Sequence, residues 1–315
     1  MKRIYLHVGM NKTGTSSIQS FFANNSHVLL DRGVLYPVTV KRGNAHHLLR
    51  KILHKGGEEG QTCRGKYLEK LRLEIESSGC DTVLLSSEEF VKTGICYESL
   101  KEVFGDTVFP IVYLRRHDSW WISLYQQALK MVVNPPWERG FSAFVRFQKE
   151  RINYWRYGQF VDHLAEIFGQ EKVAVRPYET KQLVRGNVCN DILSVIGVEA
   201  DEQLQEKIDS EGWANKSLAV VSLLVIAELM RSRLHAGLRH NLVRVFRRLP
   251  GRTTLTELVD VGLRKELIEE NIQDYRYIAK NYLGRADGQL FYDLEARKVS
   301  SSLGAKIMKQ IFREK

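Results

Sequence analysis

The stretch His7-Val8-Gly9-Met10-Asn11-Lys12-Thr13-Gly14-Thr15-Ser16-Ser17 decides the fold of this chain. It follows the apolar run 4–8, which is typical of a buried strand, and it precedes an apolar stripe at helical spacing, Ile18, Phe21, Phe22 and Leu29. A strand, a glycine-rich turn and a helix N-terminus in this order make an anion site, because backbone N–H groups and the helix dipole both favour negative charge there. Lys12 adds a full charge, and the hydroxyls of 15–17 add donors. We therefore predict a phosphate site rather than a turn whose Ser and Thr only cap the helix.

The turn differs from a Walker A loop in one informative position. Gly9 and Gly14 have the Walker spacing, but Thr15 stands where a nucleotide triphosphatase needs lysine. The lysine lies two residues before Gly14 instead.

Further apolar runs predict the rest of the sheet. We expect buried strands at 82–86, 108–114 and 173–176, separated by helical segments, and a short extended piece at 34–37. This alternation predicts an α/β fold with a P-loop-like central parallel sheet flanked by helices. Ligands bind at the carboxyl ends of strands in such sheets, and three candidate residues follow strand ends: Gly14, Glu89 and Arg115.

Length and pattern indicate one domain over residues 1–315, with a core at 1–200 and a mainly helical part at 201–315. The glycine-rich polar segment 56–65 is expected to form a surface loop. Residues 120–168 read as helical and rich in aromatics, most of them core, although Tyr154 and others would also suit stacking on sugar rings.

The chain is basic, with a net charge of +10 and a pI near 9.3, which favours nucleotides, acidic glycans or anionic lipid surfaces as partners. Seven arginines fall within 231–252, and there is no acidic residue between Glu228 and Glu257. This basic stretch has two readings: a solvated helix pair, or a surface for an acidic acceptor or an anionic membrane.

Four scattered cysteines show neither metal-ligand nor redox spacing, so we expect no metal site and a reducing compartment. We expect no signal peptide, and the longest apolar run, 218–226, is too short to span a bilayer. We expect a cytoplasmic protein, with peripheral contact at the inner membrane left open by the basic stretch.

A second motif follows the expected strand 108–114. Arg115 leaves the strand, and Ser123 comes eight residues later on the next helix. Arginine suits phosphate because its planar fork donates two parallel hydrogen bonds.

The two motifs resemble those of sulfotransferases that use 3′-phosphoadenosine 5′-phosphosulfate (PAPS). Lys-Thr-Gly-Thr-Ser at 12–16 resembles their 5′-phosphosulfate loop, and Arg115 with Ser123 resembles their 3′-phosphate motif. His117 stands where the family usually has proline, which leaves Arg115 and Arg116 both open as the ligand, although the spacing to Ser123 favours Arg115. Weaker matches to bacterial, carbohydrate-type members lie at 175–179, 215–218 and 283–291.

The resemblance implies transfer of a sulfuryl group from PAPS to a hydroxyl of a carbohydrate or glycolipid, with release of adenosine 3′,5′-bisphosphate (PAP) and no metal. Lys12 would stabilise the departing phosphate. The donor would be bound by the turn together with the second motif, that is, by Asn11, Lys12, Thr13, Gly14, Thr15, Ser16, Ser17, Arg115 and Ser123.

The resemblance also implies a base, which in glycan-modifying relatives follows the first helix. The candidates are His46 and His47, with Glu88 and Glu89 as runners-up. Adjacent helical residues point about 100° apart, so at most one of the two histidines should face the site.

Two other functions stay open. One is a P-loop nucleotide kinase, against which stand the missing lysine after Gly14 and the lack of a clear magnesium-binding aspartate. The other is a non-catalytic polyanion- or nucleic-acid-binding protein, for which charge is the only signal. We expect PAPS or PAP and an anionic or neutral glycan or glycolipid as partners, and no specific nucleic acid.

Overall fold

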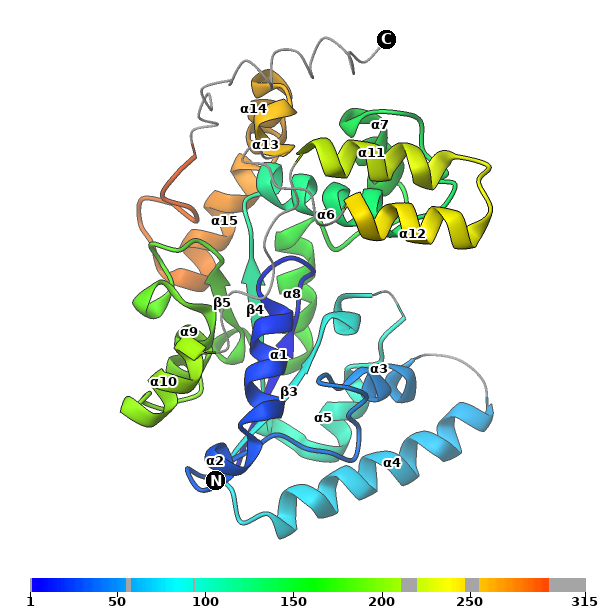
Figure 1. Ribbon diagram of the computed structural model, residues 1–315. Coiled ribbons are helices and arrows are strands. Elements are labelled where there is room, and N and C mark those ends of the chain that lie inside the picture. Colours follow the sequence, from blue (N-terminus) through cyan, green and yellow to red (C-terminus); the bar gives the residue numbers. More distant parts are fainter. Residues whose placement is uncertain (1, 55–57, 93, 211–219, 247–254, 295–315) are drawn as a thin grey trace. The chain divides into compact units, whose positions relative to one another are not determined.

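The computed structural model describes residues 2–54, 58–92, 94–210, 220–246 and 255–294 (Figure 1). The chain forms two compact units. The first comprises residues 1–115, 153–214 and 274–291, and the second comprises 116–152, 215–273 and 292–315. Within the described ranges, no helix is long and apolar enough to cross a membrane.

The first unit is built on a five-stranded sheet in which every neighbouring pair is parallel, in the order β2-β3-β1-β4-β5. This confirms the predicted α/β fold with a central parallel sheet. The strands are β1 (Arg3–Val8), β2 (Val34–Leu35), β3 (Thr82–Ser87), β4 (Val108–Leu114) and β5 (Ala174–Pro177).

Strand β1 lies in the middle of the sheet and reads as a nearly continuous apolar run because both of its faces are covered. It pairs with β3 on one side, where Leu6 lies opposite Leu85, and with β4 on the other. Its side chains are buried from Ile4 onward, and His7 is the polar exception.

Helices cover both faces of the sheet. On one face, α1 packs against α9 and against a core that includes Tyr5, Leu84 and Tyr113. Helices α5 and α8 also contact β4, and their residues do not belong to that core. The helices of this unit are α1 (Thr15–Asn24), α2 (Ser26–Leu30), α3 (His47–Leu53), α4 (Glu58–Ser77), α5 (Glu98–Phe104), α8 (Tyr157–Phe168), α9 (Val188–Val195), α10 (Glu202–Ser210) and α15 (Ile272–Leu283). Four short 3₁₀ turns join them: η1 (Glu88–Val91), η2 (Gly105–Thr107), η3 (Gln170–Lys172) and η4 (Val184–Gly186).

The prediction of a surface loop at 56–65 is wrong from residue 58 onward, because α4 begins at Glu58. Two glycines, Gly60 and Gly65, lie inside the helix, and each costs about 1 kcal/mol there relative to alanine. Burial of Leu68, Leu71 and Ile75 on the same helix stabilises it, since packing outweighs local propensity. Residues 55–57 lie outside the described ranges.

The second unit is helical and has an aromatic core. Helix α6 contacts α7, α11, α13 and α14, and it carries the fully buried Trp120 and Trp121. Trp137 and Phe144 meet edge to face at 5.1 Å, so these aromatics serve packing. The helices are α6 (His117–Met131), α7 (Phe141–Lys149), α11 (Val220–Arg231), α12 (Ala236–Phe246), α13 (Leu255–Leu258) and α14 (Val261–Glu269). The single domain expected over 1–315, with its helical part from residue 201, stays a prediction.

Candidate functional site

The carboxyl ends of the parallel strands bring the candidate residues to one edge of the first unit's sheet. The turn follows β1, Glu88 and Glu89 follow β3, Arg115 follows β4, and Tyr178 follows β5. This confirms that Gly14, Glu89 and Arg115 lie just past strand ends.

The turn after β1 has an unusual backbone. Lys12 has φ = 69° and Gly14 has φ = 78°, so both lie in the left-handed region. Non-glycine residues held there are uncommon and cluster at ligand sites. Gly14 is the N-cap of α1 and offers no side chain to the helix amides, which therefore suit an anion.

The hydroxyls of the turn divide into an inward and an outward set. Thr13 is buried and its Oγ1 donates to the carbonyl of Met10 at 2.6 Å. Thr15 is also buried, whereas Ser16 is exposed and Ser17 half-buried. The hydroxyls therefore do more than cap the helix: Thr13 fixes the turn, and Ser16 faces solvent.

Neighbouring residues press closely on the two glycines. A Cβ on Gly14 would lie 2.9 Å from Val188 and 3.0 Å from the Tyr178 ring. A Cβ on Gly9 would lie 2.6 Å from Thr15. Only glycine fits either position, and Gly14 also needs its left-handed conformation.

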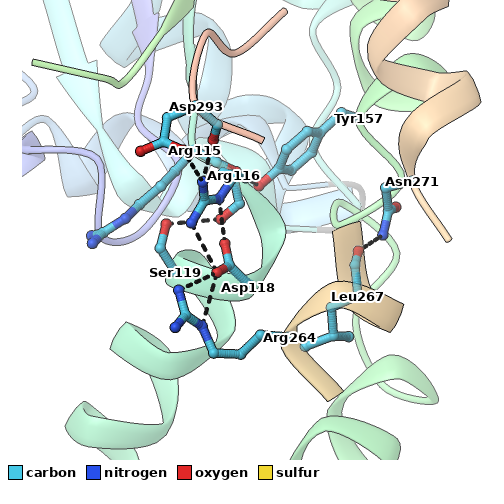
Figure 2. Close-up of polar contacts among 9 residues, drawn as sticks. All are labelled: Arg115, Arg116, Asp118, Ser119, Tyr157, Arg264, Leu267, Asn271 and Asp293. Atoms are coloured by element: carbon cyan, nitrogen blue, oxygen red, sulfur yellow. Dashed lines mark hydrogen bonds and ion pairs between the residues drawn. The ribbon is translucent and has the colours of Figure 1, made fainter. Parts of the chain in front are cut away.

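Arg115 contacts the turn directly. Its Nη1 donates to the carbonyl of Lys12 at 2.9 Å, and its guanidinium carbon lies 5.8 Å from the centre of the Tyr178 ring. The backbone carbonyl of Arg115 accepts from the Tyr157 hydroxyl at 2.7 Å, the contact drawn in Figure 2. The second motif and the turn thus meet although 103 residues separate them.

Arg116 is engaged within the second unit. Its Nε and Nη2 bind the two oxygens of the buried Asp118 at 2.6 and 3.0 Å, and it also donates to the carbonyl of Asp293 (Figure 2). Arg264 binds the same carboxylate at 2.9 Å. Between the two arginines that the sequence left open, Arg115 is therefore the one that contacts the turn. Ser123 lies half-buried on α6, and its role in donor binding stays a prediction.

His46 is enclosed in the protein and fully buried. Its Nδ1 accepts from the backbone N–H of Ser86 at 2.9 Å, and its Nε2 donates to the carbonyl of Pro37 at 2.9 Å. Burial lowers the pKa of His46 to about 4. A neutral ring with both nitrogens engaged clamps β3 to the segment before α3.

His47 has the opposite environment, although it is the next residue. It begins α3 and its side chain is 31% exposed. Its Nδ1 lies 2.8 Å from the Ser87 hydroxyl, and its Nε2 lies 3.7 Å from a carboxylate oxygen of Glu88. When Nδ1 carries the proton and donates to Ser87, Nε2 holds the lone pair that a base needs.

The two glutamates after β3 have different partners. Glu89 binds Lys92 through both carboxylate oxygens, each 2.6 Å from the ammonium. Glu88 accepts from the side-chain amide of Gln19 at 2.8 Å. The buried Ser86 hydroxyl lies 3.4 Å from the same amide and 2.8 Å from Nδ1 of His7. A polar network thus holds one carboxylate oxygen of Glu88, and His47 lies near the other.

Sequence reasoning missed the roles of Gln19 and Tyr178, and it treated Tyr154 only as one of the aromatics that are core or stack on sugar rings. Gln19 lies on α1, within the apolar stripe, and Tyr178 lies next to Gly14. The Tyr154 hydroxyl bonds to the Asn11 side chain, and burial raises the pKa of this tyrosine. Gln19 breaks the apolar pattern of a buried helix face, a signal that was available in the sequence. Among the described residues, no group of three or more His, Cys, Asp or Glu side chains lies close enough together to bind a metal ion.

The stability of the protein is expected to fall as the pH drops below 6.5. His46 has a pKa of about 4 in the folded state against an ordinary 6.5, so the unfolded chain binds more protons between those values. The contribution of His46 to the free energy of unfolding is fully present above pH 6.5. About 3 kcal/mol of it is lost as the pH falls to 4. His7, whose pKa burial lowers to about 3, acts with the same sign. Urea unfolding at pH 7.5, 6 and 5 checks this: His46→Gln should flatten the slope, and an unchanged slope would contradict it.

Comparison with known proteins gives distant similarities. No protein-family model matches the chain. An uncharacterised protein of Archaeoglobus fulgidus is 33% identical over 150 residues, which are 47% of this chain and 38% of that protein. The match thus spans well under half of that relative's length.

Among solved structures, a sulfotransferase from Alicyclobacillus acidocaldarius aligns with a TM-score of 0.40 and 16% identity, covering 76% of this chain and 99% of that one. The sulfotransferase domain of the olefin synthase of Synechococcus PCC 7002 has a TM-score of 0.36 and 14% identity, covering 79% and 96%. A retinol dehydratase in complex with androsterone and inactive cofactor PAP has a TM-score of 0.34 and 11% identity, covering 87% and 82%. Similarities with TM-scores this low assign no role to any residue of the site.

Proposed function

We propose that this protein is a PAPS-dependent sulfotransferase that moves a sulfuryl group to a hydroxyl of a carbohydrate or glycolipid. The observation that carries the proposal is the 2.9 Å hydrogen bond from Arg115 to the carbonyl of Lys12. It joins the residue expected at the 3′-phosphate to the turn expected at the 5′-phosphosulfate. Arg115, the residue Lys12, the uncapped helix amides and the left-handed turn lie at one edge of the sheet, an arrangement that suits a bisphosphorylated nucleotide.

The reaction breaks one sulfur–oxygen bond and forms another. The acceptor oxygen attacks sulfur, the bond from sulfur to the 5′-phosphate oxygen breaks, and PAP leaves with the electron pair. By analogy with phosphoryl transfer, positioning and charge stabilisation provide most of the catalysis. Lys12 and the amides of the turn stabilise the charge on the departing phosphate oxygen.

We propose His47 as the base that takes the proton of the acceptor hydroxyl. Its side chain is part-exposed, whereas both ring nitrogens of His46 are engaged and Glu89 is neutralised by Lys92. Glu88, 3.7 Å from Nε2, would stabilise the imidazolium formed by the transfer. Ser87 would fix the tautomer by accepting the Nδ1 proton.

The acceptor and the cellular location of the protein are also proposals. A glycan or glycolipid acceptor follows from the family resemblance, and the net charge of +10 favours an anionic one. In the described part of the chain Cys80 and Cys96 are free thiols, which suits a cytoplasmic location.

Replacement of Gln19 by methionine is expected to lower kcat about tenfold and to leave the KM for PAPS nearly unchanged. The substitution conserves volume but removes the hydrogen bond that holds Glu88 beside His47. Gln19 is a positioning residue in this account, so its effect should disappear in a Glu88→Gln background. Equal losses in both backgrounds would show that Gln19 acts through stability alone.

Labelled donor tests the proposed activity. The protein is incubated with PAPS carrying ³⁵S in the sulfuryl group and with a panel of glycans and glycolipids. We expect label to pass to an acceptor with release of one PAP per sulfate transferred. Release of PAP that no acceptor stimulates, together with phosphate transfer from ATP, would support the kinase alternative instead.

A further inference from the structure

The helices α11 and α12 of the second unit form a hairpin. They lie side by side (Figure 1). On α12, Val243 is buried, whereas other apolar residues of the helix are exposed.

One side of α12, its outer face, carries two exposed apolar residues. Leu238 is 52% exposed and Val245 is 59% exposed. Their spacing of seven residues places them on one side of the helix, two turns apart. Leu234, just before the helix, is 37% exposed. Scattered exposed apolar residues are ordinary, but an aligned set on one helix face marks an interaction surface.

Cations flank this apolar face. Arg233 and Arg244 are exposed, as are His235 and His240. Within the described part of the chain, neither of these two arginines forms an ion pair. Every charged residue from 229 to 256 is basic, so the sequence supplies no local carboxylate to neutralise them.

We propose that the outer face of α12 docks on an anionic membrane surface. Leu238 and Val245 enter the boundary between headgroups and acyl chains, and Arg233 and Arg244 bind the anionic headgroups. An apolar stripe beside cations on a helix that lies in the interface is the composition that such a surface selects. This inference depends on the surface of the second unit and not on the proposed transferase activity.

Charge argues against the other occupants. A symmetric contact with a second copy would bring two copies of this wholly basic stretch together, like charge against like. Nucleic acid would use the arginines but leaves the exposed Leu238 and Val245 without a role, because phosphate contacts supply its affinity. An anionic lipid surface uses both.

Vesicle sedimentation of the full chain tests the proposal. The probes are phosphatidylcholine vesicles and phosphatidylcholine–phosphatidylglycerol vesicles in a 7:3 ratio, at 50 and 500 mM NaCl. Wild type should bind the anionic vesicles at least tenfold more tightly than the neutral ones, and high salt should weaken this binding. Leu238→Glu and Val245→Ser should each reduce it, the former about tenfold.

The matched control is Leu73→Glu on α4, where the leucine is equally exposed at 52%. This variant should bind vesicles as wild type does. Equal binding by Leu238→Glu and Leu73→Glu, or equal binding of wild type to both vesicle types, would overturn the proposal. A wild-type dimer in light scattering that Leu238→Glu dissociates, without anionic-vesicle binding, would assign the face to a second copy instead.

Discussion

Replacement of His47 by alanine is expected to lower kcat by about 10²–10⁴-fold and to leave the affinity for PAP unchanged. In the proposed mechanism the imidazole takes the acceptor proton and does not bind the nucleotide, so its loss should appear in the chemical step. The turn, Lys12 and Arg115 are intact in this variant, so donor binding is retained. Single-turnover kinetics with labelled PAPS, alongside calorimetry with PAP, measures both quantities.

The neighbouring histidine supplies the control for that result. His46→Gln should reduce stability while leaving kcat within a few-fold of wild type, because the Nε2 donor to Pro37 is replaced by an amide donor. A His47→Ala variant with near-normal kcat, together with a Glu89→Gln variant that is inactive, would move the role of base to Glu89.

Replacement of Lys12 by alanine is expected to lower kcat/KM by about 10²–10³-fold, or 2.7–4 kcal/mol of transition-state stabilisation. The ammonium is a full charge at the turn, and charge develops on the 5′-phosphate oxygen as sulfur departs. The loss should appear in kcat more than in the affinity for PAPS, since the bridging oxygen of bound PAPS carries less of that charge than it does in the transition state.

Two substitutions separate the charge of Lys12 from its backbone role. Lys12→Met keeps the length of the side chain at the left-handed position and should lose as much activity as alanine. Lys51→Ala, at an exposed lysine of α3, should leave kcat/KM unchanged. If Lys12→Met retained wild-type kcat/KM, the role assigned to the ammonium would be wrong.

The parts of the fold that could be predicted have strong local signals. Strand β1 is a continuous apolar run, and the residues Gly9 to Gly14 combine glycines, hydroxyls and a lysine that no ordinary turn requires. Strand direction alone then places Gly14, Glu89 and Arg115 at one edge of the sheet. These inferences need no knowledge of which helix packs where.

The choice between His46 and His47 could not be made from sequence. The angle between adjacent helical residues predicts that only one faces the site, but not which one. The choice depends on β3, because His46 bonds to the backbone of Ser86 and His47 bonds to the side chain of Ser87. Each of these bonds joins residues that lie 40 positions apart in the sequence, so no local pattern encodes it.

The same limit explains the other omissions. Gln19 bonds to Glu88, which lies 69 residues later in the sequence. Tyr178, which follows β5, lies against Gly14, which follows β1. The segment 58–65 reads as a loop because of its two glycines, yet it is helical because the apolar residues that follow it are buried. Tertiary packing decided each of these cases.

The most direct test is calorimetric titration of the protein with PAP, in buffer without Mg²⁺, for wild type, Lys12→Ala and Arg115→Ala. We predict micromolar binding by wild type, tighter than binding of ATP with or without Mg²⁺, and a loss of about 1 kcal/mol or more in each variant. A folded wild type that binds no PAP, or that prefers Mg²⁺-ATP, would contradict the assignment of the turn and Arg115 to a PAPS site.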